Sequence, residues 1–251
     1  MGNTGVKSLP QGEPDNGYIN QPTNDENDME GIATFEHSSV TAVDKWFSNP
    51  KLSNYEDFED YVKNNYSAES AIDYYTGNGY DYLNEELYET PWDDMTDSKK
   101  KKAADLFNAL NQFELNKAIL CSRGTSLSYF GNSHNAEGLK DFLNKSDGLL
   151  QFNGFQSTST GSDPAFGGSL VIHYTIPPSK GAGAYVRPIS NHPSEREFLL
   201  NTNGVFKFDT SSIKVIHGTV HINAAWVGQA ADQVFTKDSG DAVYTPKSKK
   251  S

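Results

Sequence analysis

Cysteine and long hydrophobic runs are scarce in this sequence. The one cysteine, Cys121, excludes a disulfide within the chain, which suits a reducing compartment. It stands in the apolar stretch KAILCSRGTS and is interpreted as a small buried residue of a strand. No run of about 18 apolar residues occurs, so we predict no transmembrane helix. The first residues contain no apolar signal core, so we expect no secretory signal.

Positive charge is also in deficit, because 21 Lys and Arg residues face 33 Asp and Glu residues and the formal net charge is −12. A groove that binds nucleic acid through its phosphates needs clustered cations, so the composition argues against one. A local basic pocket for a small anion is still compatible with it. The six histidines show no metal-ligand spacing, and His173 and His217 lie in strand-like runs where structural roles are expected. We predict no metal site.

Hydrophobic periodicity divides the rest of the chain. Residues 1–30 are rich in Gly, Pro, Asn, Asp and Gln and predict a flexible leader, and residues 237–251 predict a flexible tail. Residues 31–117 show helical spacing, with Ser38 or Ser39 as the first N-cap and later helices starting at Ser67 or Ser70 and at Asp97 or Ser98. A break is expected at Gly77–Gly79.

Residues 118–236 change to short stretches that are β-branched or aromatic and bounded by Gly, Pro, Asn and Ser. One helix is expected among them, around NAEGLKDFLNK. The pattern predicts an α+β fold, in which an N-terminal helical portion packs on a mainly antiparallel, two-sheet β core. We expect a single domain over residues 31–236.

Three features of the strand half can carry chemistry. Arg123 ends an apolar strand and precedes Gly124, so a guanidinium could bind an oxyanion where a ligand approaches the backbone closely. In FQSTSTG, Ser157 and Ser159 should face one side of a strand and Thr158 the other. A surface salt bridge and an ordinary polar strand are the plain alternatives to these two readings.

The third feature is the pair Glu195 and Glu197 in NHPSEREFLL. On a strand, residues two apart point the same way and lie about 7 Å apart, so both carboxylates should share a face. Like charges that close raise one pKa unless a cation or ligand lies between them. The plain alternative is a solvated strand end beside a turn.

Together, these motifs resemble those of the ADP-ribosyltransferases of the arginine–serine–glutamate class, which include the catalytic chains of clostridial binary toxins and transferases of T-even-like phages. The class has an Arg on an early strand, an aromatic-x-Ser-Thr-Ser strand and a Glu-x-Glu or Gln-x-Glu pair. Here these read SRG at Arg123, FQSTS from Phe155 to Ser159, and EREFLL from Glu195. The resemblance covers roughly residues 66–225, including AIDYYTGNGYDYLNEEL, PPSKGAGAYV and NTNGVFKF.

The resemblance implies that NAD+ is the co-substrate and that Arg123 holds its diphosphate. Glu197 would then contact the nicotinamide ribose, with Ser157 hydrogen-bonded to it, and Glu195 would face the acceptor. The Glu-x-Glu form resembles the arginine-specific members. The NAD-binding residues implied are Arg123, Gly124, Ser157, Thr158, Ser159, Phe166 and Glu197.

The resemblance further implies other parts of the site. Residues 187–194 would present the acceptor, although Pro193 stands where some relatives carry an aromatic residue. Phe166, in the loop 161–169, is expected to stack on nicotinamide, with a plain core position as the alternative. Tyr75 or Tyr80 could pack near NAD+, although core positions are favoured for both.

Three functions compete for this site. The favoured one is transfer of ADP-ribose to an arginine of a host protein, with a nucleic-acid end as the least favoured acceptor. An NAD+ glycohydrolase and a non-catalytic NAD- or ADP-ribose-binding module are the alternatives. We expect a monomer without membrane contact that acts in the cytoplasm of a bacterial host, made there by a phage or delivered there as a toxin-like effector.

Overall fold

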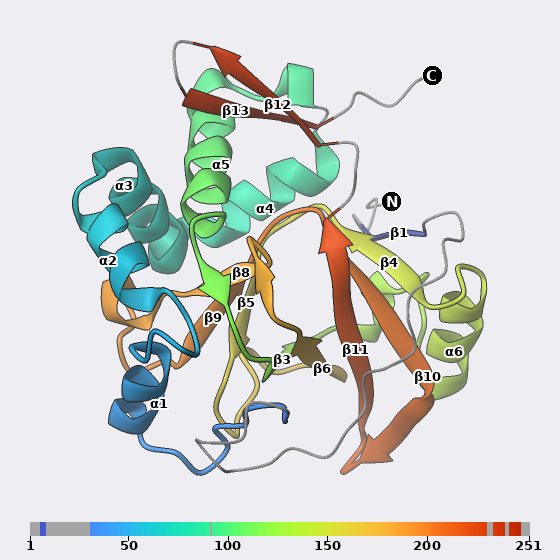
Figure 1. The fold of residues 1–251 in the computed structure, drawn as a ribbon. Coiled ribbons are helices and arrows are strands. Elements are labelled where there is room, and N and C mark those ends of the chain that lie inside the picture. Colours follow the sequence, from blue (N-terminus) through green and yellow to red (C-terminus); the bar gives the residue numbers. More distant parts are fainter. Residues whose placement is uncertain (1–5, 9–30, 91, 230–232, 239–240, 247–251) are drawn as a thin grey trace.

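The computed structural model describes residues 6–8, 31–90, 92–229, 233–238 and 241–246 (Figure 1). Helices fill the N-terminal part of this range, and a single further helix lies among the strands, as expected. The helices are α1 (Val40–Phe47), α2 (Tyr55–Lys63), α3 (Tyr66–Tyr74), α4 (Tyr80–Glu89), α5 (Asp97–Leu110) and α6 (Ala136–Asn144). In Figure 1, α6 lies beside the strand β10 at the right. Helices α1 to α3 lie at the left of the strands, and α4 and α5 lie above them. The helical half and the strand half therefore follow the predicted order.

The helix starts differ from the prediction in two places. The N-cap of α5 is Thr96, one residue before Asp97 and Ser98, which were predicted as its caps. Ser39 caps α1, accepting a hydrogen bond from the Ala42 backbone N at 3.2 Å, which confirms one of the two predicted caps. Helix α3, in contrast, begins earlier than predicted from Ser67 or Ser70. Its N-cap is Asn65, whose side chain accepts from the Ala68 backbone N at 3.2 Å. Asparagine caps a helix as well as serine does, so the earlier residue satisfies the free amide groups first.

The expected break after α3 is a π-helical turn, Tyr75–Gly79, that leads into α4. Gly77 has non-helical dihedral angles, with φ −80° and ψ −119°. Gly79 permits a close approach, because a Cβ there would lie 2.4 Å from the Tyr74 ring. The YTGNG stretch thus redirects the chain at the edge of the site described below, as π-turns often do in proteins.

Nine strands form one continuous ladder in the order β1-β4-β10-β11-β6-β3-β5-β9-β8. Within it, only β11 and β6 pair in parallel. These strands are β1 (Val6–Ser8), β3 (Ile119–Thr125), β4 (Leu149–Phe152), β5 (Gln156–Ser159), β6 (Leu170–Ile176), β8 (Gly183–Tyr185), β9 (Glu197–Leu200), β10 (Gly204–Ile216) and β11 (Thr219–Gln229). Two further pairs are β2 (Glu114–Leu115) with β7 (Ser179–Lys180) and β12 (Gln233–Asp238) with β13 (Asp241–Pro246). The mainly antiparallel α+β fold is confirmed.

The ladder comes close to dividing into the two sheets that the sequence predicts. Strand β3 pairs with β6 over its whole length but with β5 only through Ser122 and Ser159. This single pair joins a section of six strands to the three-stranded section β5-β9-β8. The two sections therefore diverge beyond that pair, and the residues of the predicted motifs lie along this opening.

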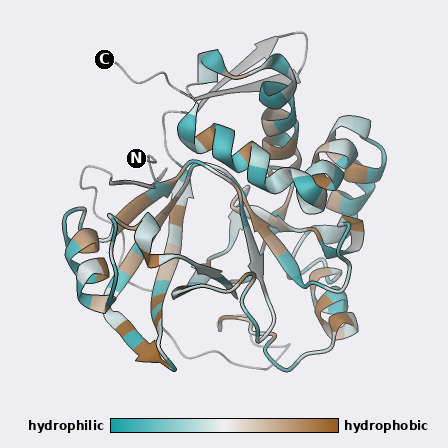
Figure 2. Cartoon of the chain, turned by 180° about the vertical axis from the view of Figure 1, so that it is seen from behind, coloured by the Kyte–Doolittle hydropathy of each residue, from teal (hydrophilic) through white to brown (hydrophobic). Residues whose placement is uncertain are grey.

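One hydrophobic cluster contains residues of both the helices and the strands. The Phe47 ring of α1 stacks on Tyr185 of β8, with centroids 4.1 Å apart and planes 8° from parallel. Phe113, after α5, meets Phe198 of β9 edge-on at 5.9 Å. Figure 2 shows the strands largely hydrophobic, whereas the helices carry both hydrophilic and hydrophobic stripes. The helices thus fix the three-stranded section from one side.

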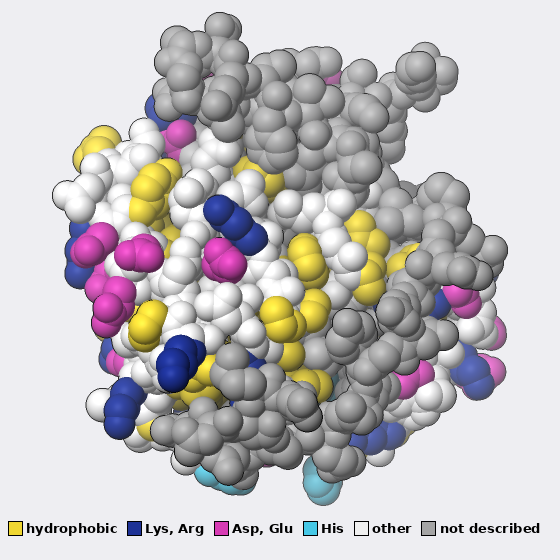
Figure 3. Space-filling view, in the orientation of Figure 1, with side chains coloured by type: hydrophobic (Ala, Val, Ile, Leu, Met, Phe, Trp, Pro, Cys, Tyr) yellow, Lys and Arg dark blue, Asp and Glu magenta, His cyan; other side chains and the backbone are white. Residues whose placement is uncertain are grey.

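Acidic side chains gather at the left of the face shown in Figure 3, where α2 lies with Glu56 and Asp57 in its first turn.

Within the expected leader, Val6–Ser8 form β1, and within the expected tail, Asp241–Pro246 form β13. The remaining residues of both segments lie outside the described residues, apart from the first two of the tail, which end β12. None of the described helices is long and apolar enough to span a membrane.

Candidate active site

A cleft of about 390 Å³ lies at the opening between the two sections of the ladder. Three chain segments surround it: the π-turn before α4, the loop that follows β5, and the turn before β9. The residues that line it are Tyr75, Thr76, Gly77, Tyr80, Ser157, Thr158, Ser159, Asp163, Pro164, Ala165, Phe166, His192, Ser194, Glu195, Arg196 and Glu197. Two of the three predicted motifs therefore meet at one cleft, although they are about 40 residues apart in the sequence.

Arg123 of the third motif lies directly beside the cleft. Its half-buried guanidinium donates from Nη1 to the Ser157 carbonyl at 2.9 Å and lies over the Phe166 ring, 4.6 Å from the centroid. Among the described residues it forms no ion pair within 4.0 Å. The predicted alternative, a surface salt bridge, is therefore wrong. A guanidinium held in place without a carboxylate partner keeps donors for an anionic ligand.

The FQSTS strand alternates as predicted. Ser157 and Ser159 are half-buried on one face of β5, and Thr158 is fully buried on the other. The Thr158 hydroxyl donates to the Phe198 carbonyl, and the Ser159 hydroxyl accepts from the Gly161 backbone N at 3.1 Å. The Thr158 hydroxyl thus ties β5 to β9, and a contact of Thr158 with NAD+ stays a prediction. Ser157 and Ser159 lie on the other face of β5 and also line the cleft.

Glu197 is the first residue of β9 and is only 5 % exposed. The pKa of its carboxyl is raised to about 7, chiefly by burial and in addition by the nearby charge of Glu195. A hydrogen bond from Ser157 and the charge of Arg123 oppose this rise and lower the pKa. All three predicted motifs thus act on one buried carboxyl group, which is the arrangement that often marks a functional site.

Glu195 does not share a strand face with Glu197, which corrects the prediction. Strand β9 begins only at Glu197, and Glu195 is exposed in a turn whose backbone N–H donates to the His192 carbonyl at 2.9 Å. Pro193 lies inside this turn, and its lack of an N–H and its fixed φ favour a turn over a strand. One carboxyl group is therefore buried at the cleft, and the other lies at its mouth.

Arg196, between the two glutamates, is a half-buried residue that the sequence did not single out. Its Nη1 donates to the Ser38 carbonyl at 2.6 Å, and its backbone carbonyl accepts from Thr160 N at 2.9 Å. A Cβ on Gly161 would lie 2.3 Å from its guanidinium. Arg196 thus braces the turn against α1 and against the start of the 161–169 loop.

Phe166 of that loop lies against Gly124 of β3. Phe166 is 46 % exposed and has a φ of +62°, and Tyr80 packs on its ring at 5.8 Å, so a plain core position is excluded. A left-handed φ at a bulky residue is costly and often marks a functional segment. The space above Gly124 is filled by the Phe166 carbonyl, 2.4 Å from where a Cβ would lie. The glycine therefore makes room for this loop, and the expectation that it makes room for a ligand is corrected.

Asn84 of α4 is a further residue that sequence reasoning missed. Its side chain accepts from the Phe155 backbone N at 2.9 Å and donates to the Phe155 carbonyl and to the Tyr75 hydroxyl, both at 3.1 Å. Tyr75 is 1 % exposed, belongs to the core and also lines the cleft, and burial raises the pKa of its hydroxyl. An Asn in an otherwise amphipathic helix beside the YTGNG break was the available signal.

The remaining candidate residues lie elsewhere. Cys121 is buried and burial raises the pKa of its thiol, which confirms a core role. His173 bonds His221 on the neighbouring strand, Nε2 to Nδ1 at 3.0 Å, and burial lowers the pKa of His173 to about 4. His217, expected in a strand, instead lies in the turn after β10 with a φ of +48°. Among the described residues no group of three His, Cys, Asp or Glu side chains could hold a metal ion.

Comparison with solved structures shows the same fold in bacterial toxins. Plx2a, an ADP-ribosyltransferase toxin from Paenibacillus larvae, matches with a TM-score of 0.63 at 23 % identity over 78 % of this chain and 99 % of that chain. BECa, an ADP-ribosylating toxin of a binary enterotoxin of C. perfringens solved with NADH, matches with a TM-score of 0.62 at 19 % identity, over 78 % of this chain and 50 % of that chain. C3stau2 from S. aureus, solved with NAD, matches with a TM-score of 0.59 at 18 % identity, over 78 % of this chain and 99 % of that chain.

A search of curated protein sequences found no match. A family model described as ADP-ribosyltransferase exoenzyme matches residues 41–226. This range runs from the second residue of α1 into β11 and includes every residue that lines the cleft. The chain therefore belongs to the ADP-ribosyltransferase exoenzyme family.

Proposed function

We propose that this chain is a mono-ADP-ribosyltransferase that moves ADP-ribose from NAD+ to the side chain of an arginine. The observation that carries the proposal is the buried carboxyl group of Glu197, which Ser157 and Arg123 adjoin in one cleft. Two structural relatives were solved with NAD or NADH, which supports the choice of co-substrate. The family match supports the transfer of ADP-ribose.

Arg123 supplies the cation that NAD+ needs in a protein whose net charge is −12. Its guanidinium is half-buried, held at one end by the Ser157 carbonyl, and has no ion-pair partner within the described part of the chain. A bidentate contact to the diphosphate suits this fork of donors. Phe166, exposed beside it, provides a ring face for nicotinamide.

Glu197 stabilises the positive charge that develops on the ribose. The bond between the anomeric carbon and the nicotinamide nitrogen breaks, the electron pair leaves with nicotinamide, and an oxocarbenium-like sugar results. A fixed carboxylate beside that carbon lowers the barrier in the way known for glycosidases. The Ser157 hydroxyl, hydrogen-bonded to Glu197, keeps the carboxylate in position and favours its charged form.

Glu195 receives the acceptor at the mouth of the cleft. Its exposed carboxylate can pair with an incoming guanidinium. As the guanidinium nitrogen forms its bond to the anomeric carbon, the proton that it loses passes to Glu195. The separation of a buried and an exposed carboxylate supports this division between donor and acceptor.

An NAD+ glycohydrolase that uses the same cleft is the second candidate. It would need Glu197, Ser157 and Arg123 in the same roles, with water in place of the acceptor. The exposed position of Glu195 favours transfer, because hydrolysis does not need a carboxylate at the mouth. The third candidate, a non-catalytic binding module, does not account for a carboxyl group kept at a raised pKa in the cleft.

The acceptor that we propose is an arginine of a host protein, modified in the host cytoplasm. Two of the structural relatives named above, Plx2a and BECa, are toxins by their titles, which supports delivery of this chain as a toxin-like effector. Production inside a bacterial host by a phage is the second route. We place a nucleic-acid end last among acceptors, because the chain carries few cations for phosphate contacts.

The test of the arginine acceptor uses labelled NAD+ and agmatine, a small guanidine. We expect the wild type to transfer ADP-ribose to agmatine. Glu195→Gln should retain NAD+ hydrolysis and lose transfer by about 100-fold, the usual size of an acid–base contribution. If the wild type hydrolyses NAD+ and transfers to neither agmatine nor any protein of a host lysate, the glycohydrolase is the correct function.

A further inference from the structure

The segment between β8 and β9 forms a closed loop that ends at Glu197. Its base is closed by a hydrogen bond from the Val186 backbone N to the Glu197 carbonyl at 3.1 Å. The residues between them return to the same place over a short distance, as in an Ω-loop. Exposed loops of this kind vary in conformation unless their own side chains or neighbours hold them. Beside Arg196, whose bond to the Ser38 carbonyl is described above, two further residues of the loop make such contacts.

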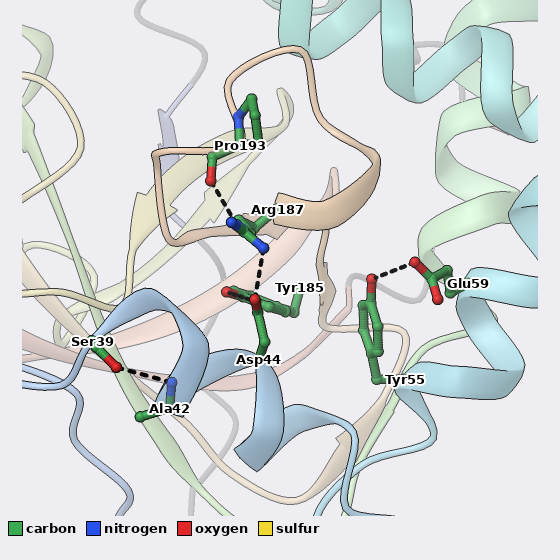
Figure 4. Close-up of polar contacts among 8 residues, drawn as sticks. All are labelled: Ser39, Ala42, Asp44, Tyr55, Glu59, Tyr185, Arg187 and Pro193. Atoms are coloured by element: carbon green, nitrogen blue, oxygen red, sulfur yellow. Dashed lines mark hydrogen bonds and ion pairs between the residues drawn. The ribbon is translucent and has the colours of Figure 1, made fainter.

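The first of them is Arg187, at the start of the loop (Figure 4). Its Nε donates to the Pro193 carbonyl at 2.6 Å, across the loop, while its Nη1 binds Asp44 Oδ2 of α1 at 2.6 Å. Asp44 is itself fixed, because its other oxygen accepts from the Tyr185 hydroxyl at 2.9 Å. One planar guanidinium therefore joins both sides of the loop to α1 through donors in a fixed geometry, which the flexible ammonium group of a lysine lacks.

The second is Asn191, near the tip of the loop. Its Nδ2 donates to the carbonyl and to the Oδ1 of Asp73 in α3, at 2.7 and 2.9 Å. Its backbone N donates to the Thr76 hydroxyl of the π-turn at 3.2 Å. The Thr76 hydroxyl in turn donates to the Ile72 carbonyl at 2.9 Å. The tip is thus tied to α3 and to the π-turn, whereas Arg187 ties the loop to α1.

Glu195 comes after Arg187 and Asn191 in the same loop. Its turn is closed onto His192, the residue after Asn191, and Pro193 inside that turn is the acceptor for Arg187. Both anchors therefore limit where the exposed Glu195 carboxylate can lie relative to Glu197. Neither anchor contacts Glu197, Ser157 or Arg123 through a hydrogen bond among the described contacts.

We propose that Arg187 and Asn191 are positioning residues that fix the acceptor carboxylate Glu195, and so select transfer over hydrolysis. The inference rests on the proposed function. Holding a catalytic group in place matters because a displacement of about 1 Å can cost about 100-fold in rate. The nicotinamide–ribose bond breaks at Glu197, on the regular strand β9, so hydrolysis does not depend on the two anchors.

The variants that test this are Arg187→Lys and Asn191→Ala. Lysine keeps the charge beside Asp44 but lacks the rigid fork of donors that holds Asp44 and the Pro193 carbonyl in one fixed geometry. Alanine at position 191 removes the bonds to Asp73. The matched control is Lys63→Gln, which removes an exposed ion pair with Glu59 of 3.1 Å on α2, away from the loop. Thermal melting of each variant establishes that it is folded.

Two readouts are compared: the ratio of agmatine transfer to NAD+ hydrolysis, and amide hydrogen exchange of the segment 187–196. We expect both variants to lower the ratio by about tenfold or more, with hydrolysis changed less than about twofold. Exchange of the segment should become about tenfold faster. The control should leave the ratio and the exchange as in the wild type.

Other results overturn the proposal. If exchange becomes faster while the ratio stays constant, or if transfer and hydrolysis fall in proportion, the anchors do not position Glu195. If exchange in both variants equals that of the wild type, the anchors do not hold the loop. A wild type without either reaction would refute the proposed function, and the exchange data would then decide on the anchors alone.

Discussion

Burial of the Glu197 side chain and its proposed function favour opposite charge states of its carboxyl group. Burial at 5 % exposure favours the neutral carboxylic acid, whereas stabilisation of an oxocarbenium-like sugar needs the carboxylate. Ser157 and Arg123 shift the balance back towards the charged form. The side chain is therefore held near the point of ionisation, and a ligand or solvent change at neutral pH alters its charge.

This balance predicts a pH dependence. With a pKa of about 7 for Glu197 in the free protein, kcat/KM for NAD+ should rise about tenfold per pH unit below 7 and level off above it. Ser157→Ala removes a hydrogen bond that lowers the pKa, so its midpoint should move to higher pH. The measurement is the pH profile of kcat/KM for both proteins. Equal midpoints would contradict the proposed role of Ser157.

The same ionisation makes the free energy of unfolding depend on pH. Because the folded pKa lies above the usual value of 4.5, the native state binds more protons than the unfolded state between pH 4.5 and about 7. Glu197 therefore costs stability as pH rises through this window. The cost is fully present above the folded pKa, where it amounts to at most about 3 kcal/mol.

At the scale of residues, the sequence identified the chemical groups more reliably than their neighbours. Arg123, Ser157 and Glu197 could be selected because their residue types and order are distinctive. The role of Gly124 could not, since the carbonyl above it belongs to Phe166, more than 40 positions away. Close approaches of that kind depend on tertiary packing and leave no local pattern.

At the scale of elements, α4 and β5 are joined by Asn84. Its amide makes two hydrogen bonds to the Phe155 backbone and one to the buried Tyr75 hydroxyl. The strand that carries Ser157 therefore starts from a fixed point on the helical half. The sequence predicted both elements from their periodicity, but not the side chain that connects them.

Asn84→Ala should consequently weaken the fold and the site together. It removes the Asn84 bonds to the Phe155 amide and carbonyl and one of the side-chain partners of the buried Tyr75 hydroxyl, which should lower the free energy of unfolding by about 2–3 kcal/mol. Asn64→Ala, which removes one exposed bond to the Asp60 carbonyl, is the matched control and should cost less than about 1 kcal/mol. Urea denaturation measures both. Equal losses in the two variants would show that the Asn84 contacts do not anchor β5.

Element boundaries show what local signals can decide. Ser39 was identified as a cap because serine before an apolar helical repeat is a strong signal. The sequence placed Glu195 on a strand by alternation alone, whereas the bond from its backbone N to His192 closes a turn there. Alternation does not distinguish a strand from an extended turn at its end. Pro193, which cannot donate to a strand ladder, is the local signal for the turn.

At the scale of the whole molecule, the site exists because the ladder nearly separates. A single pair, Ser122 with Ser159, joins the six-stranded section to the three-stranded one. The helical half packs on the smaller section through Phe47 and Phe113 and brings the π-turn to the opening. The sequence predicted an α+β fold with two sheets, and it could not predict that one residue pair connects them.

The central claim is that Glu197 promotes cleavage of the nicotinamide–ribose bond, and release of nicotinamide from NAD+ tests it most directly. Wild type and Glu197→Gln should both bind NAD+, since the diphosphate contact lies at Arg123. The variant should release nicotinamide about 100- to 1,000-fold more slowly, as expected when an electrostatic stabiliser is lost. Release by Glu197→Gln at the rate of the wild type, or no release by the wild type, would contradict the account.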